Sequence, residues 1–155
     1  MDLIVVLMGW LHLLSTVIWV GGIIFILYIA LPSSRQVSGP DAGRLMGEMS
    51  GRFTPFANYS ILLLVVTGVV LSWSKGYCQT VSAFDGITAF AVALKYLLAL
   101  MMIVVHFYRG LLLAPRISVA EPTRKAALQK WSLNLVKVNL FSGVLILLLS
   151  VLMRH

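Results

Sequence analysis

Hydrophobic residues in this chain form long uninterrupted blocks rather than the apolar stripes, at helical spacing, of a soluble amphipathic helix. A helix needs about 20 apolar residues to cross the hydrocarbon core of a bilayer. The blocks that reach or approach this length are Leu3–Leu31, Phe56–Trp73, Ile87–Leu113 and Trp131–Met153. Residues 123–130 contain no helix breaker and extend the last block. The pattern therefore predicts one all-α membrane domain over residues 1–155, with four transmembrane helices at about 3–31, 56–73, 87–113 and 123–153.

Prolines and turn-forming residues mark the predicted ends of these helices. Pro32 and the stretch up to Gly39–Pro40 close the first helix, and Pro115 closes the third. Between the first and second helices, Ala42–Phe53 has the pattern of a short amphipathic helix lying at the membrane surface. Pro55 suits the start of the second spanning helix. No internal repeat is evident in the sequence.

Composition and charge agree with a membrane protein and fix its expected orientation. Of the 155 residues, 60% are hydrophobic and 11% are charged, against about 25% charged in a soluble domain. The net charge of +7 does not indicate nucleic-acid binding, because the basic residues cluster in loops 32–55 and 114–130. By the positive-inside rule these loops are cytoplasmic and both termini are non-cytoplasmic. We therefore expect an up-down-up-down four-helix bundle, a multi-pass protein of a bacterial inner membrane.

Several cationic or ionisable side chains lie inside the apolar blocks, where each costs about 3 kcal/mol on insertion scales. They are His12, Lys95, His106, Arg109 and Lys137. No Asp or Glu lies deep enough in the blocks to pair with them. This imbalance indicates an anionic guest, a metal, or neutral forms of His and Lys. A haem would satisfy both needs, with iron for nitrogen ligands and propionates for cations.

Helical spacing groups these residues by face and by depth. Lys95 and His106 are eleven residues apart, almost three whole turns, and therefore share a face. On the first helix His12, Trp19 and Gly22 lie along one stripe, and the glycine there leaves room for a close helix neighbour or a flat ring.

A rise of about 1.5 Å per residue also separates two predicted clusters. The outer one contains His12, Thr67 and Lys95; the other, nearer the cytoplasm, contains His106, Arg109, Asn134 and Lys137. His12 and His106 differ in depth by about 14 Å, which is too far for one iron between them. Ligation by His12 with Lys95 at the same level fits better, and two separate sites also fit.

Short motifs in three of the helices resemble a known membrane family. They are Trp10-Leu11-His12 and Trp19-Val20-Gly21-Gly22, then Val66-Thr67-Gly68, then Leu94-Lys95-Tyr96-Leu97 and His106 to Gly110. This order resembles the copper-resistance D (CopD-like) family and the related HemJ-type protoporphyrinogen oxidases. The resemblance implies a four-helix bundle. HemJ-type relatives are haem b proteins with a functional histidine and lysine that match His12 and Lys95, whereas CopD relatives are assigned to copper handling.

The leading hypothesis is a haem b protein in electron transfer or in porphyrin or quinone redox chemistry, as an oxidoreductase of the HemJ type or a quinone-linked one. His12 is then an axial ligand, and Lys95 or His106 supplies the second ligand or a proton donor. Lys95 and Arg109 are the candidate catalytic residues. Arg109 and Lys137 would hold carboxylates, and the predicted pocket is lined by Trp19, Gly22 and Thr67.

Two alternatives belong to other functional classes. In the first, the chain transports copper, with His12, Met102 and His106 as successive ligands; imidazole and soft thioether groups suit Cu(I). In the second, it is a membrane anchor subunit of a redox complex. Expected partners are the lipid bilayer, a porphyrin or quinone, and either a second copy of the chain or a redox partner subunit.

Overall fold

The computed structural model describes residues 3–74 and 86–152, and over these ranges the chain is almost entirely helical, with no strand. Three runs of helix are long and apolar enough to cross a membrane: Leu3–Ser74, Ala89–Val119 and Pro122–Leu152. The prediction of an all-α membrane protein is confirmed over the described residues, while the prediction of a single domain stays a prediction. The number of crossings stays a prediction, because the run Leu3–Ser74 joins two helices that the sequence pattern separated.

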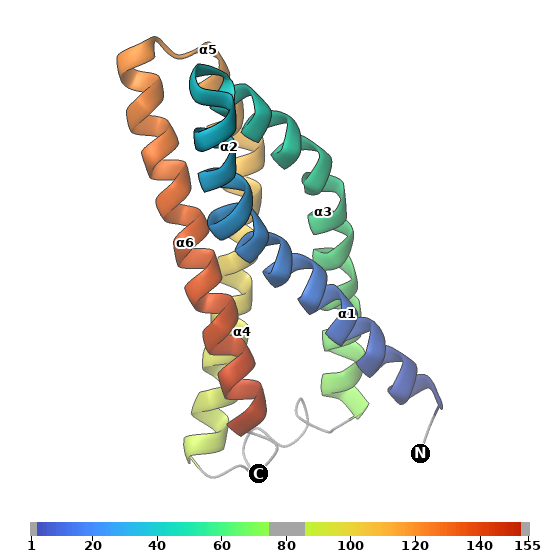
Figure 1. Cartoon of the computed structure of the whole chain (residues 1–155). Helices are drawn as coiled ribbons and strands as arrows, with labels where there is room; N and C mark the ends of the chain where they lie inside the picture. Colours follow the sequence, from blue (N-terminus) through green and yellow to red (C-terminus); the bar gives the residue numbers. More distant parts are fainter. Residues whose placement is uncertain (1–2, 75–85, 153–155) are drawn as a thin grey trace. The chain divides into compact units, whose positions relative to one another are not determined.

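The chain divides into two compact units, Met1–Phe84 and Asp85–His155. The first unit is a helical hairpin (Figure 1). One arm consists of α1, a π-helical segment η1 and α2, and the other arm is α3. Their bounds are Leu3–Phe25 for α1, Ile26–Ala30 for η1, Leu31–Ser38 for α2 and Ala42–Ser74 for α3. A short 3₁₀ turn, Gly39–Asp41, joins the arms.

The second unit repeats this order of elements. It contains α4, a π-helical segment η3, the short α5 and the long return helix α6, which packs beside α4 in Figure 1. Their bounds are Gly86–Phe107 for α4, Tyr108–Leu113 for η3, Ala114–Val119 for α5 and Pro122–Leu152 for α6. Ala120 is extended, which lets the chain reverse. Although the sequence shows no evident repeat, both units contain an α-helix, a π-helical segment, a short α-helix and a long return helix in the same order.

The sequence pattern predicted that Pro32 and Pro115 end their helices, but in the structure neither proline does so. Each lies in the first turn of a short α-helix that continues to Ser38 or Val119, and each directly follows a π-helical segment. A proline lacks the N–H that would bond four residues back, and its ring crowds that carbonyl. The wider π turn changes the hydrogen-bond register just before the proline, so the helix bends and continues. The predicted ends at residues 31 and 113 are therefore too early.

The predicted start of the second spanning helix at Phe56 is also displaced. The segment Ala42–Phe53 is helical as expected, but α3 continues from it through Pro55 without a break. Beside the proline, the Thr54 hydroxyl donates to the carbonyl of Ser50 at 2.8 Å, one turn earlier on the same helix. The surface segment and the spanning helix are thus one element.

The turn between α2 and α3 depends on Gly39. Its φ of +46° lies in the left-handed half of the backbone map, which side chains with a Cβ rarely adopt. The chain reverses at this glycine, so the hairpin of the first unit closes here rather than at Pro32.

The first unit packs closely where α1 meets α3. The aromatic ring of Phe53 lies directly over Gly22, so that a Cβ added to Gly22 would come within 2.0 Å of Phe53 Cζ. The sequence pattern predicted that a flat ring could approach this face, and the ring found there belongs to the chain itself. Gly21, by contrast, has nothing within 4 Å of an added Cβ. Ser15, Trp19 and Ile23 are buried on the same stripe of α1.

Large apolar side chains are exposed along the length of every long helix, including Leu14 on α1, Val69 on α3, Leu100 on α4 and Leu148 on α6. A soluble protein does not leave so much continuous apolar surface in water. Together with the three long apolar helical runs, this surface identifies an integral membrane protein whose helices face lipid.

The Gly22–Phe53 contact predicts opposite results for two neighbouring glycines. Gly22→Ala should destabilise the protein by about 1–3 kcal/mol, because the new methyl group overlaps the Phe53 ring. Gly21→Ala should leave the thermal midpoint in detergent unchanged or slightly raised. Adding Phe53→Leu to Gly22→Ala should recover part of the loss. Equal midpoints for the two single variants would contradict the packing.

Candidate functional site

His12 is partly buried on α1 and contacts α3 on one side of its ring. Its Nδ1 lies 2.7 Å from Oγ1 of Thr67. The ring also rests against the helix backbone beside Thr67, since its Cε1 lies 3.6 Å from the position of a Cβ added to Gly68. The motif Val66-Thr67-Gly68 therefore contributes both a polar partner and a bare surface for the imidazole.

Thr67 is one of the most completely buried polar residues of the described chain, with 1% of its surface exposed. Its hydroxyl also lies 2.5 Å from the carbonyl oxygen of Leu63, one turn earlier on α3. Such a bond to the carbonyl four residues back is usual for Thr in a membrane helix. Thr67 thus links the α3 backbone to His12. The sequence analysis had put these two residues at the same depth in the membrane.

Trp19 lies two turns along α1 from His12 and is buried, which agrees with a position in the interior of the first unit. Gly22, the next predicted pocket residue, is covered by Phe53. The roles of both residues toward a bound cofactor stay predictions.

In the second unit, one of the buried polar side chains is a residue that the sequence analysis did not name. Asn139 on α6 is 3% exposed, and its Nδ2 donates to the carbonyl of Met102 on α4 at 3.2 Å. Among the described residues, its Oδ1 is the buried side-chain atom that has no hydrogen-bond partner. Met102 itself is 2% exposed. Asn139 and Met102 are therefore both buried in this hairpin, and the amide of Asn139 is bound to the backbone of Met102.

The sequence contained a signal for Asn139. Small and polar residues recur on one face of α6 at positions i, i+3 and i+4, namely Asn139, Ser142 and Gly143. All three are buried. The sequence analysis instead named Asn134, which is exposed. Spacing alone did not show which face of α6 meets α4.

Arg109 lies on the π-helical segment η3 and is partly buried. Its Nε donates to the hydroxyl of Ser132 on α6 at 3.1 Å. His106 and Lys95, on α4, are also partly buried, whereas Lys137 is exposed on α6. Of the predicted inner cluster, the structure thus places Lys137 and Asn134 at the surface and joins Arg109 to Ser132.

The predicted pairing of His12 with Lys95, and any shared ligation by His12 and His106, involves residues of both units and stays a prediction. Within residues 3–74 and 86–152, no group of three or more His, Cys, Asp or Glu side chains has the arrangement of a metal site.

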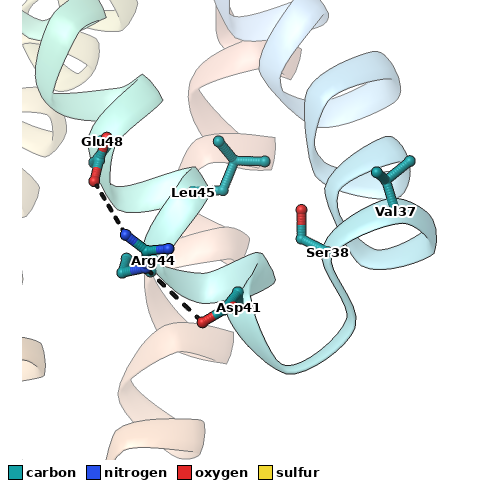
Figure 2. Close-up of a pocket in the computed structure, with 6 residues that line it drawn as sticks. All are labelled: Val37, Ser38, Asp41, Arg44, Leu45 and Glu48. Atoms are coloured by element: carbon teal, nitrogen blue, oxygen red, sulfur yellow. Dashed lines mark ion pairs between the residues drawn. The ribbon is translucent and has the colours of Figure 1, made fainter.

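A pocket of about 380 Å³ opens at the turn between α2 and α3 (Figure 2). Arg44 is central to it and lies 3.8 Å from Asp41 and 3.9 Å from Glu48. These ion pairs are well exposed and stabilise the turn by at most about 1 kcal/mol. A second, apolar pocket lies between the start of α1 and the end of α3 and is lined by Leu3, Val69 and Trp73 among others. Neither pocket contains a predicted ligand residue.

Comparison with protein families identifies a relationship that covers most of the chain. The family model of copper resistance protein D matches residues 47–153, more than two-thirds of the chain. No curated protein and no solved structure matches. The matched region includes Thr67, Lys95, Met102, His106 and Arg109, while His12 precedes it.

The match bears on one of the two families named from the motifs. It confirms the CopD-like resemblance and gives no support to the HemJ-type one. It also favours the copper alternative over haem, because the family description names copper. The chain, an integral membrane protein, belongs to the copper resistance protein D family.

Proposed function

We propose that this chain binds copper within the bilayer and passes it across the membrane, with His12 as a ligand of Cu(I). The observation that supports this most directly is the contact between His12 Nδ1 and the buried Thr67 hydroxyl. An ionisable side chain inside a membrane helix indicates a functional site. Here the imidazole is also held in one orientation, as metal-binding histidines generally are.

The donor atoms within the helices suit Cu(I) as the transported ion. Cu(I) is soft and accepts thioether sulfur and imidazole nitrogen. His12 supplies an imidazole in the first unit. In the second unit Met102 and His106 are four residues apart on α4 and therefore lie on one face of that helix. Copper would move between such neutral ligands without needing a buried carboxylate.

Four crossings of the bilayer, with both termini on the non-cytoplasmic side, complete the proposal. Each hairpin crosses twice, and its basic turn lies in the cytoplasm. Arg35 and Arg44 flank the first turn, and Arg116 and Arg124 flank the second. Trp10, Trp73 and Trp131 are exposed and lie toward the ends of the apolar blocks of the sequence, where amphipathic rings favour the membrane interface.

The haem b hypothesis, with Lys95 and Arg109 as catalytic groups, stays a prediction with no supporting observation. The same preparation that tests copper binding also tests it. A purified haem protein is coloured and has a Soret band that shifts on reduction, whereas a Cu(I) protein without haem has no such band.

Copper ligation by His12 predicts a loss of affinity in His12→Ala. Detergent-purified protein should bind Cu(I) stoichiometrically in an anaerobic titration against a competing chelator. Removal of the ligand should weaken binding by roughly 10- to 100-fold or more. His155→Ala, which also removes one histidine, serves as the control and should bind normally. Unchanged affinity in His12→Ala, or a Soret band in the unsubstituted protein, would contradict the proposal.

Participation of Met102 predicts a difference between two adjacent methionines. Met102→Leu keeps the apolar volume but removes the sulfur, and we expect Cu(I) transit into proteoliposomes to fall about tenfold, equivalent to about 1.4 kcal/mol. Met101→Leu changes the neighbouring residue, which is less buried, and should have little effect. If both variants conduct as well as the unsubstituted protein, Met102 is a packing residue only.

The proposed topology predicts that the two turns are reached from the cytoplasm. Val37 and Val119 are 86% and 85% exposed, so cysteines at these positions are accessible to a thiol reagent. In a Cys78→Ser background, Val37→Cys and Val119→Cys should resist a membrane-impermeant maleimide in intact cells and react after permeabilisation. Asp2→Cys should react in intact cells. The opposite pattern at either turn would exclude this orientation.

A further inference from the structure

The hydroxyl of Thr67 has one proton and three polar neighbours: His12 Nδ1 and the carbonyl oxygens of Leu63 and Leu64. The Leu64 carbonyl, at 3.5 Å, is the most distant of the three and, like that of Leu63, can only accept. The carbonyl oxygen of Leu63, 2.5 Å away, is only an acceptor. That separation is typical of a strong O–H···O bond and requires the hydroxyl proton between the two oxygens. Toward His12 Nδ1, at 2.7 Å, Thr67 is then left with a lone pair and acts as an acceptor.

The imidazole must complete this bond as the donor. If Thr67 accepts, the proton of the contact belongs to Nδ1 of His12. In a neutral imidazole with Nδ1 protonated, the lone pair is on Nε2. The chain of bonds from His12 to Thr67 to Leu63 therefore selects one of the two tautomers.

The packing of the ring places the two nitrogens differently. Cε1 lies against Gly68, and Nδ1 contacts the residue before it. The ring thus turns its Nδ1–Cε1 edge toward α3, and Nε2 lies beyond Cε1, away from Thr67. Because Thr67 is almost fully buried, water does not compete for the Nδ1 proton there.

From this geometry we infer that Thr67 is a positioning residue, which holds His12 in the Nδ1-protonated tautomer so that Nε2 is the nitrogen that binds copper. Metal-binding histidines commonly donate their other ring N–H to a neighbouring acceptor, which fixes both tautomer and orientation. The tautomer follows from the contacts alone, and only the role in copper binding rests on the proposed function.

The tautomer is measured directly in copper-free protein. In detergent-purified protein labelled with ¹⁵N-histidine, long-range ¹⁵N–¹H correlation separates a protonated ring nitrogen from one with a lone pair, and the His12 signals are those lost in His12→Ala. We expect a protonated Nδ1 and a lone pair on Nε2. Protonated Nε2 in the unsubstituted protein would overturn the inference, whether or not any variant folds.

Three variants isolate the hydroxyl. Thr67→Val keeps the shape of the side chain and removes the acceptor, so the His12 signals should shift toward the other tautomer or a mixture. Thr67→Ser keeps the hydroxyl and should restore the original signals. Gly68→Ala is the matched control, because its methyl group meets the same ring at an ordinary 3.6 Å and leaves the hydrogen bond in place. An unchanged tautomer in Thr67→Val would overturn the positioning role.

Cu(I) titration of the same variants then separates this inference from the proposed function. Thr67→Val should weaken affinity by roughly 10- to 100-fold, as loss of a supporting hydrogen bond does at other metal sites, and Thr67→Ser should recover it. If His12→Ala weakens copper binding and Thr67→Val does not, the positioning role is wrong while the proposed function stands. If no variant, His12→Ala included, affects copper, the proposed function is wrong while the tautomer result stands.

Discussion

The bilayer core offers no hydrogen-bond partner, so the backbone N–H and C=O groups of a spanning segment must be satisfied within the protein, and side-chain hydroxyls gain by bonding there too. This requirement explains why the described chain is helical almost throughout. It also explains why the hydroxyls of Thr67, Ser72, Ser142 and Ser150 each bond a carbonyl four residues earlier in the same helix. At Thr67 the same requirement has a second consequence. Because the Thr67 hydroxyl donates its proton to a backbone carbonyl, a lone pair on the hydroxyl oxygen is available to accept from His12 and so to orient it.

A proline removes one backbone N–H donor from this hydrogen-bond pattern, and both units accommodate the loss in the same way. A π-helical segment precedes Pro32 and Pro115, so a short α-helix continues beyond each proline before the chain reverses. The reversals differ: Gly39 uses a positive φ, whereas Ala120 is extended. The two units therefore have the same arrangement of a π-helical segment and a proline, although their sequences are dissimilar. Within the first hairpin, the missing side chain of Gly22 admits the ring of Phe53 and lets α1 and α3 approach closely.

Membership of the copper resistance protein D family gives the buried nitrogen and sulfur atoms a chemical context. The match covers α3 to α6, and His12 precedes it on α1. His12 is nevertheless in contact with the matched region, because its Nδ1 hydrogen-bonds Thr67 of α3. In the second unit, the Asn139 amide holds the Met102 carbonyl in an interior that also contains the Met102 thioether. Each hairpin thus contains a residue of the proposed copper path, His12 or Met102, that hydrogen-bonds a buried polar side chain of the neighbouring helix.

The sequence by itself determined the membrane class, the all-α fold and most of each apolar helix, because hydropathy and helix propensity add up locally along the chain. It also named His12 and Thr67 as neighbours in depth. It did not determine where helices end at proline, since that depends on a π turn that no single residue specifies. Only the tertiary structure decided that Phe53 covers Gly22, that Thr67 contacts His12, and that Asn139 rather than Asn134 faces α4. These contacts join residues 31 to 55 positions apart, and the rotation of each helix about its axis, which packing alone fixes, selects them.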